Sequence, residues 1–253
     1  MTRPDAVSSG RPHADRYRAS SHGRHHTPSL SQVEAHLGNE VRICAKDTHG
    51  EWIVEGTDLL VSVGRMPNTK GTGWGQVGVE LDEHGYIKAN DRLETTASNV
   101  CAMGECAGSP QFTHVAYHDF RVVRDNLKGG NRSTKDRIVP FCMFTDPELA
   151  RVGRNETEAR RDKIEYRVAK LLMANVLRTV TIAEPRGFMK MLIGKENDEI
   201  VCFTASGIEA SELMAAVHTR RLPYTAMGDA IFAHPTMSEG LVFLLGQVEK
   251  RNS

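Results

Sequence analysis

Residues 187–205 read GFMKMLIGKENDEIVCFTA, and this stretch decides the fold of the second half of the chain. Two apolar runs, 187–193 and 199–205, flank a polar turn at residues 196–198, which is the pattern of an antiparallel hairpin. Residues 208–219 follow with Leu213, Ala216 and Val217 at helical spacing, so they predict an amphipathic helix. A helix that alternates with antiparallel strands indicates an α+β fold.

Further elements are predicted on both sides of this hairpin. Asn155 and Glu158 have the spacing of a capping box, which predicts a helix over residues 155–161. One longer helix is expected from about Val115 to Leu127, with Thr113 at its start. Short strands are predicted at residues 41–46, 52–54, 58–63, 100–103 and 166–170.

The composition is that of a globular protein, with 40% apolar and 25% charged residues among 253. The formal net charge is zero, which gives no electrostatic reason to expect a nucleic acid or an anionic membrane as partner. No run approaches the roughly 18 apolar residues of a membrane helix. Five scattered cysteines favour a reducing, cytoplasmic compartment over a disulphide framework, and none has zinc-finger spacing with histidine, so no metal site is expected.

Three domains are expected along the chain. Residues 1–32 are rich in Ser, Arg, His, Gly and Pro and poor in apolar side chains, so we expect a disordered tail. Residues 33–135 carry short strands and one helix. Residues 136–250 form the unit of sheet and helices that is built around residues 187–205.

The sequence HPTMSEG at residues 234–240 is a candidate catalytic site. Pro235 favours a turn after His234, and Thr236 or Ser238 can cap a helix over residues 239–245. Glu239 would then reach one ring nitrogen of His234 and raise the basicity of the other, as in a general acid/base. The alternative is a buried His-Pro turn in which Glu239 is only a solvated helix residue.

Gly104-Glu105 is a candidate ligand turn, because a carboxylate next to glycine after a strand can bind the hydroxyl groups of a sugar or polyol. The helix that starts at Thr113 offers its positive N-terminal end to an anionic group.

Four ordered motifs, at residues 58–69, 95–126, 140–153 and 234–240, resemble the flavin-dependent pyridine nucleotide-disulphide oxidoreductases, especially the mercuric-reductase-like and dihydrolipoamide-dehydrogenase-like members. The resemblance covers residues 33–248, which correspond to the C-terminal half of such an enzyme. It implies the end of the NAD(P)H and FAD domains, followed by an antiparallel dimerisation domain and a homodimer.

The resemblance also implies roles for individual residues. Residues 64–68 match a Gly-Arg-x-Pro-Asn loop between the nucleotide domains, and Gly104-Glu105 matches a Gly-Asp pair that binds the flavin ribityl chain, with Glu in place of Asp. The helix start that faces the flavin ring matches residues 113–116, namely Thr113, His114, Val115 and Ala116. His234 and Glu239 match the acid/base pair that serves the redox disulphide of the partner subunit. The presence of this histidine favours a dithiol or disulphide substrate.

Other family motifs are not found. No GxGxxG follows a predicted strand, and the glycines of residues 71–75 have the wrong spacing, so the FAD site is expected to be incomplete and the NAD(P)H phosphate loop absent. Cys101 and Cys106 have Cys-x4-Cys spacing but fall in the ribityl motif. We therefore expect a truncated or split oxidoreductase, inactive alone, whose N-terminal half a separate chain would carry; the alternative is a non-catalytic dimerisation module.

Overall fold

The computed structural model describes residues 29–35, 41–47, 50–58, 64–217 and 223–248, which form two compact units, Met1–Arg65 and Met66–Ser253. The described part of the first unit is a three-stranded antiparallel sheet of order β1-β2-β3. Its strands are β1 (Ser29–Ala35), β2 (Val41–Asp47) and β3 (Gly50–Gly56). The predicted hairpin at 41–46 and 52–54 is confirmed as β2 and β3, and residues 59–63 of the next predicted strand lie outside the described residues.

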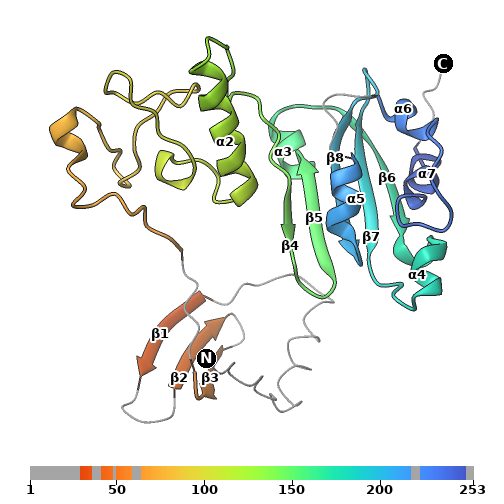
Figure 1. The fold of residues 1–253 in the computed structure, drawn as a ribbon. Helices are drawn as coiled ribbons and strands as arrows, with labels where there is room; N and C mark the ends of the chain where they lie inside the picture. The colour runs from red at the N-terminus through yellow and green to blue at the C-terminus, as the bar shows by residue number, and fades with distance from the viewer. Residues whose placement is uncertain (1–28, 36–40, 48–49, 59–63, 218–222, 249–253) are drawn as a thin grey trace, which may run out of the picture. The chain divides into compact units, whose positions relative to one another are not determined.

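A five-stranded antiparallel sheet of order β4-β5-β8-β7-β6 organises the second unit (Figure 1). The predicted hairpin at residues 187–205 is confirmed as two of its inner strands, in which Met191 pairs with Phe203. The α+β fold class is therefore confirmed. The strands are β4 (Phe141–Met143), β5 (Glu148–Gly153), β6 (Tyr166–Leu172), β7 (Phe188–Gly194) and β8 (Ile200–Gly207).

Short helices cover this sheet and close its core. Helix α5 packs on β5 and β8, and α7 packs on β6 and β7. Of the residues predicted to form the apolar stripe of α5, Leu213 and Val217 are buried at 1% exposure, whereas Ala216 is exposed. The helices are α3 (Glu156–Arg161), α4 (Leu177–Thr181), α5 (Ala210–Val217), α6 (Tyr224–Gly228) and α7 (Gly240–Leu245).

Residues 66–137 contain one long helix and little sheet. Helix α2 (Thr113–Asn126) confirms the prediction, and it is accompanied by the 3-10 turns η2 (Trp74–Val77) and η3 (Glu105–Ala107). The predicted strand at 100–103 is wrong, because Cys101 makes only an isolated bridge to Glu94. Its neighbour in the fold is the irregular segment around Leu93, whose φ of 67° ends any regular ladder.

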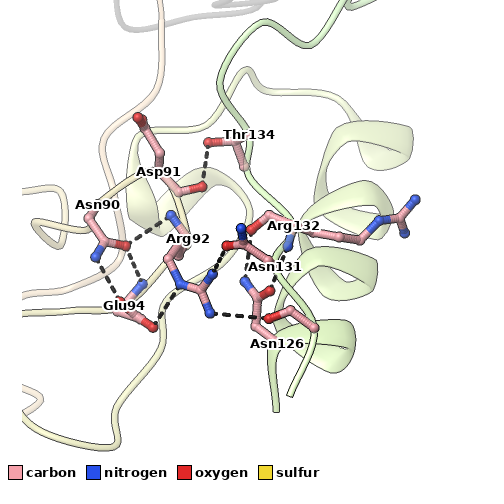
Figure 2. Close-up of polar contacts among 9 residues, drawn as sticks. Asn90, Asp91, Arg92, Glu94, Asn126, Asn131, Arg132 and Thr134 are labelled. Atoms are coloured by element: carbon pink, nitrogen blue, oxygen red, sulfur yellow. Dashed lines mark hydrogen bonds and ion pairs between the residues drawn. The ribbon is translucent and has the colours of Figure 1, made fainter. Parts of the chain in front are cut away.

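Polar contacts fasten the end of α2 to the loop at residues 90–94 (Figure 2). The guanidinium of Arg92 donates to Asn131 at 2.5 Å and to the carbonyl of Gly130 at 3.4 Å. The backbone N–H of Thr134 donates to the carbonyl of Asp91 at 2.8 Å. These contacts fix α2 against the segment that leads into Gly104. No helix in the described part of the chain is long and apolar enough to cross a membrane.

Candidate active site and cofactor turn

The His234 segment is a tight turn that leads into the buried helix α7. The His234–Pro235 peptide bond is cis, and the hydroxyl of Thr236 accepts a hydrogen bond from the N–H of Glu239 at 3.2 Å. The predicted capping of the helix by Thr236 or Ser238 is wrong, because the N-cap residue of α7 is Glu239 and no side-chain hydrogen bond caps it. Thr236 instead holds the turn that precedes α7. Leu241 and Leu244 are fully buried in the core of the sheet, so α7 sets the position of the carboxylate that precedes it.

His234 and Glu239 form the predicted pair. The distances from Nδ1 of His234 to the two carboxylate oxygens are 2.9 and 3.0 Å. The His234 side chain is 62% exposed and that of Glu239 is 22% exposed, so the imidazole is held from one side and open on the other. With Nδ1–H donating to the carboxylate, Nε2 is left as the nitrogen that exchanges protons. This arrangement differs from a buried His-Pro turn with a solvated glutamate.

Exposed apolar side chains lie close to this pair in the sequence. Ile231 is 101% exposed, and Phe243 and Val242 of α7 are 48% and 37% exposed. Monomeric proteins rarely expose large contiguous apolar patches, and where such patches occur they commonly mark interaction sites. These three exposed apolar side chains therefore lie within nine residues of His234 along the chain.

The Gly104–Glu105 turn has a shape that only glycine permits. Gly104 has φ 74° and ψ −153°, and a Cβ at this position would lie 3.2 Å from the Cβ of Ala116 on α2. This close approach brings the turn against the helix. Glu105 follows as the first residue of η3, so its carboxylate starts from a fixed backbone position. A side chain at Gly104 would therefore press on Ala116 and change the shape of the turn.

The start of α2 offers backbone N–H groups, while the side chain of Val115 is buried. The N–H groups of Val115 and Ala116 donate to the carbonyl of Phe112 at 3.0 and 3.1 Å. Among the described residues, the N–H groups of Thr113 and His114 have no such partner, so these two are available to a ligand. The His114 ring stacks on Phe112 at 5.1 Å, and its Nε2 lies 2.8 Å from the carbonyl of Pro140.

The predicted residues fall into two groups that no hydrogen bond or ion pair joins within the described residues: the pair His234 and Glu239, and the turn with the start of α2. The prediction missed Asp119, whose carboxylate accepts a hydrogen bond from the N–H of Gly104 at 2.8 Å. A signal was present, because Asp119 lies on the apolar stripe of α2 with Val115 and Val122, where a charged side chain needs a reason.

The remaining motifs take no part in either group. Contrary to the prediction, Gly73, Gly75 and Gly78 do have GxGxxG spacing, but they flank the short turn η2 instead of linking a strand to an α-helix. Cys101 and Cys106 are free cysteines, and the Cys106 sulfur lies 3.4 Å from the carbonyl of Met103. In the described residues no cluster of His, Cys, Asp and Glu has the arrangement of a metal site.

Two family models match the chain. Residues 139–244 match the pyridine nucleotide-disulphide oxidoreductase dimerisation domain, and residues 26–119 match the pyridine nucleotide-disulphide oxidoreductase model. The first match covers the five-stranded sheet with its helices, including His234 and Glu239. The second covers Gly104, Glu105 and the first half of α2.

Curated relatives agree with these matches. The chain is 34% identical over 220 residues to the probable pyridine nucleotide-disulfide oxidoreductase RclA of Escherichia coli, which is 85% of this chain and 49% of the relative. It is 37% identical over 188 residues to dihydrolipoyl dehydrogenase of Thermus scotoductus, covering 73% and 40% of the two chains. The chain thus spans about half the length, or less, of these relatives.

A solved structure has the same fold. The HOCl-induced flavoprotein disulfide reductase RclA from Escherichia coli superposes with a TM-score of 0.75 at 33% identity, over 87% of this chain and 51% of that one.

Proposed function

Since this chain belongs to the pyridine nucleotide-disulphide oxidoreductase family, we propose that it supplies three parts of an FAD-dependent enzyme. These parts are the C-terminal contacts to FAD, the dimer interface, and the His234–Glu239 acid/base for a dithiol/disulphide reaction. The nucleotide phosphate loops and the redox disulphide would come from the N-terminal half of the enzyme, which a separate chain can carry.

The observation that carries this proposal is the pairing of His234 Nδ1 with both oxygens of Glu239 at 2.9 and 3.0 Å. A dithiol loses a proton as its thiolate attacks a disulphide, and the departing thiolate must gain one. An imidazole whose Nδ1–H is held by a carboxylate accepts and returns that proton at Nε2. The high exposure of His234 supports a role towards a group on another surface, such as the partner subunit.

FAD fits the turn and the start of α2 in chemical type. Glu105 would accept hydrogen bonds from the ribityl hydroxyls, and the N–H groups of Thr113 and His114 would face the flavin ring. The close approach of Gly104 to Ala116 keeps this turn free of a side chain. When bound, FAD supplies electron transfer between NAD(P)H and the disulphide. This chain's own contribution would be to bind and orient the FAD and to keep water away from it.

A homodimer follows from the same proposal. The match to the family's dimerisation domain and the exposed Ile231, Val242 and Phe243 beside His234 support it. In a homodimer this apolar surface would be buried against the partner, and His234 would face the partner's redox site. A cytoplasmic location, which five free cysteines favour, completes the proposal.

Titration with FAD of this chain, in the presence of the disulphide-bearing half of a relative, tests the proposal. We expect saturable binding, seen as quenching of flavin fluorescence and structured flavin absorbance. Gly104→Val should abolish binding, because the new side chain would collide with Ala116. Val77→Thr, at an exposed position of η2, is the matched control and should bind FAD normally. A dimeric chain that never binds FAD would instead support a non-catalytic dimerisation module.

A further inference from the structure

A buried carboxylate stands behind the Gly104–Glu105 turn. Asp119 is fully buried at 0% exposure, on the face of α2 that packs against the turn. One of its oxygens accepts the N–H of Gly104 at 2.8 Å, and the other accepts the guanidinium of Arg137 at 2.5 Å. A buried charge is costly unless it is paired and hydrogen-bonded, and here both oxygens have partners.

Arg137 connects this carboxylate to two further segments. Its second terminal nitrogen donates to the hydroxyl of Ser109 at 3.2 Å, just after η3, and Ser109 is 8% exposed. Arg137 itself is 15% exposed. The planar guanidinium can hold both partners at once, which an ammonium group cannot do with the same geometry. Gly104, Ser109 and α2 are therefore held by one cation and one anion.

The segment that leads from Arg137 into β4 is tied to the same helix. The carbonyl of Pro140 lies 2.8 Å from His114 Nε2 at the start of α2. The ring of Phe141, the first residue of β4, stacks on Phe112 with centroids 6.3 Å apart. The entry to the five-stranded sheet is thus attached to the start of α2, where the loop that holds the cofactor turn ends.

We propose that Asp119 and Arg137 are positioning residues that hold the Gly104–Glu105 turn in its ligand-accepting shape and fasten it to the segment entering β4. The consequence for FAD rests on the proposed function, whereas the effect on the turn does not. An ion pair with only a general stabilising role would loosen the whole unit when broken. When a positioning ion pair is broken, the turn loosens before the rest of the unit does.

Native-state hydrogen exchange of the Gly104 amide tests the local effect. The loss of a hydrogen bond to a charged group should speed this exchange by about 10- to 100-fold in Asp119→Asn. Arg137→Lys keeps the charge but loses the geometry to Ser109, so its effect should be smaller, and that of Ser109→Ala smaller still. Arg121→Gln is the matched control, because it removes an exposed arginine from the same helix.

The amides of Val122 and Phe203, which lie in two of the three buried clusters of this unit, serve as internal references. Equal acceleration at Gly104, Val122 and Phe203, or no change at Gly104 in any of the three variants, would overturn the proposal. If Asp119→Asn does not fold, Arg137→Lys and Ser109→Ala still decide it.

The FAD arm is measured separately. In a chain that binds FAD, Arg137→Lys should weaken binding by about 10-fold and blur the structured flavin absorbance, while Arg121→Gln leaves both unchanged. Unchanged affinity in Arg137→Lys would contradict the link between the pair and the cofactor. Failure of the unmodified chain to bind FAD even with the disulphide-bearing half of a relative present would refute the proposed function, and the exchange of the Gly104 amide would still decide the role of the pair.

Discussion

At the scale of single residues, His234 shows how a short motif acquires a chemical role. The turn after His234, in which the N–H of Glu239 donates to the hydroxyl of Thr236, brings the carboxylate of Glu239 to 2.9 Å from the ring. Neither residue alone is informative in the sequence. Their spacing of five residues across a turn is what places a carboxylate on Nδ1.

His234→Gln should slow the dithiol/disulphide half-reaction by about 10²–10⁴-fold, the usual cost of removing a general acid/base. The assay is stopped-flow kinetics on a complex of this chain with the disulphide-bearing half of a relative. Flavin reduction by NAD(P)H is the internal control and should be nearly unchanged. Glu239→Gln should cost less, because the imidazole remains. Equal loss in both half-reactions would mean that His234 acts in folding or packing.

His118 makes stability depend on pH. Burial lowers the pKa of His118, and the charges of Arg137, Arg121 and Arg132 add to this effect against Asp119. As the pH falls, His118 therefore gains its proton at about pH 6.5 in the unfolded chain and only at a lower pH in the folded chain. The stability from His118 is present above about pH 6.5 and is lost as the pH falls towards the depressed folded pKa.

Thermal unfolding between pH 7.5 and 5 measures this dependence. We expect His118→Gln to flatten the fall of Tm on the acidic side. His84→Gln, at a side chain that is 72% exposed, should leave the profile unchanged. A steeper profile in His118→Gln would contradict the sign of the shift.

At the scale of elements, α3 is fixed by its own sequence. The side chain of Asn155 accepts the N–H of Glu158 at 2.8 Å, and the carboxylate of Glu158 accepts the N–H of Asn155 at 2.8 Å. The carboxylate of Glu156 also pairs with Lys190 of β7 at 3.2 Å. A six-residue helix depends on such contacts because it is too short to be stable alone.

Asn155→Ala should therefore lower the free energy of unfolding by about 1 kcal/mol, the typical value of an N-cap. Chemical denaturation followed by circular dichroism measures the change. Thr157→Ala, at an exposed position of the same helix, is the control and should shift stability little. Equal losses in the two variants would remove the capping box as the cause.

At the scale of the whole molecule, the second unit combines a well-packed sheet with an uncovered apolar surface. The core beneath α5 and α7 is a large cluster of buried apolar side chains, whereas Ile231 and Phe243 are exposed. This contrast is typical of a subunit whose assembly buries the rest, and stable obligate interfaces commonly exceed ~2,000 Å².

Ile231→Asp should weaken the homodimer by at least about 10-fold, because a charge would be buried in the interface. Sedimentation at micromolar concentrations measures the equilibrium. Val77→Asp places the same charge on an exposed valine outside residues 139–244 and should leave the dimer intact. A folded monomer before any substitution would refute the interface.

The sequence by itself determined the local elements of this protein. The central hairpin, the capping box and α2 follow from periodicity and end signals, which act over a few residues and need no partner. The pair His234 and Glu239 was also predictable, because both residues lie on one turn. The helix predicted at residues 208–219 is found as α5 from Ala210 to Val217, and Ala216 of its predicted stripe is exposed, since a stripe predicts a face but not its edges.

Only the tertiary structure decided the features that join distant residues. Asp119 and Gly104 are 15 residues apart, and Arg137 and Ser109 are 28 apart, so their hydrogen bonds leave no periodic trace in the sequence. The same is true of the failed strand at 100–103. An apolar run becomes a strand only where a regular neighbour offers a ladder of N–H and C=O groups, and the kink at Leu93 withholds it.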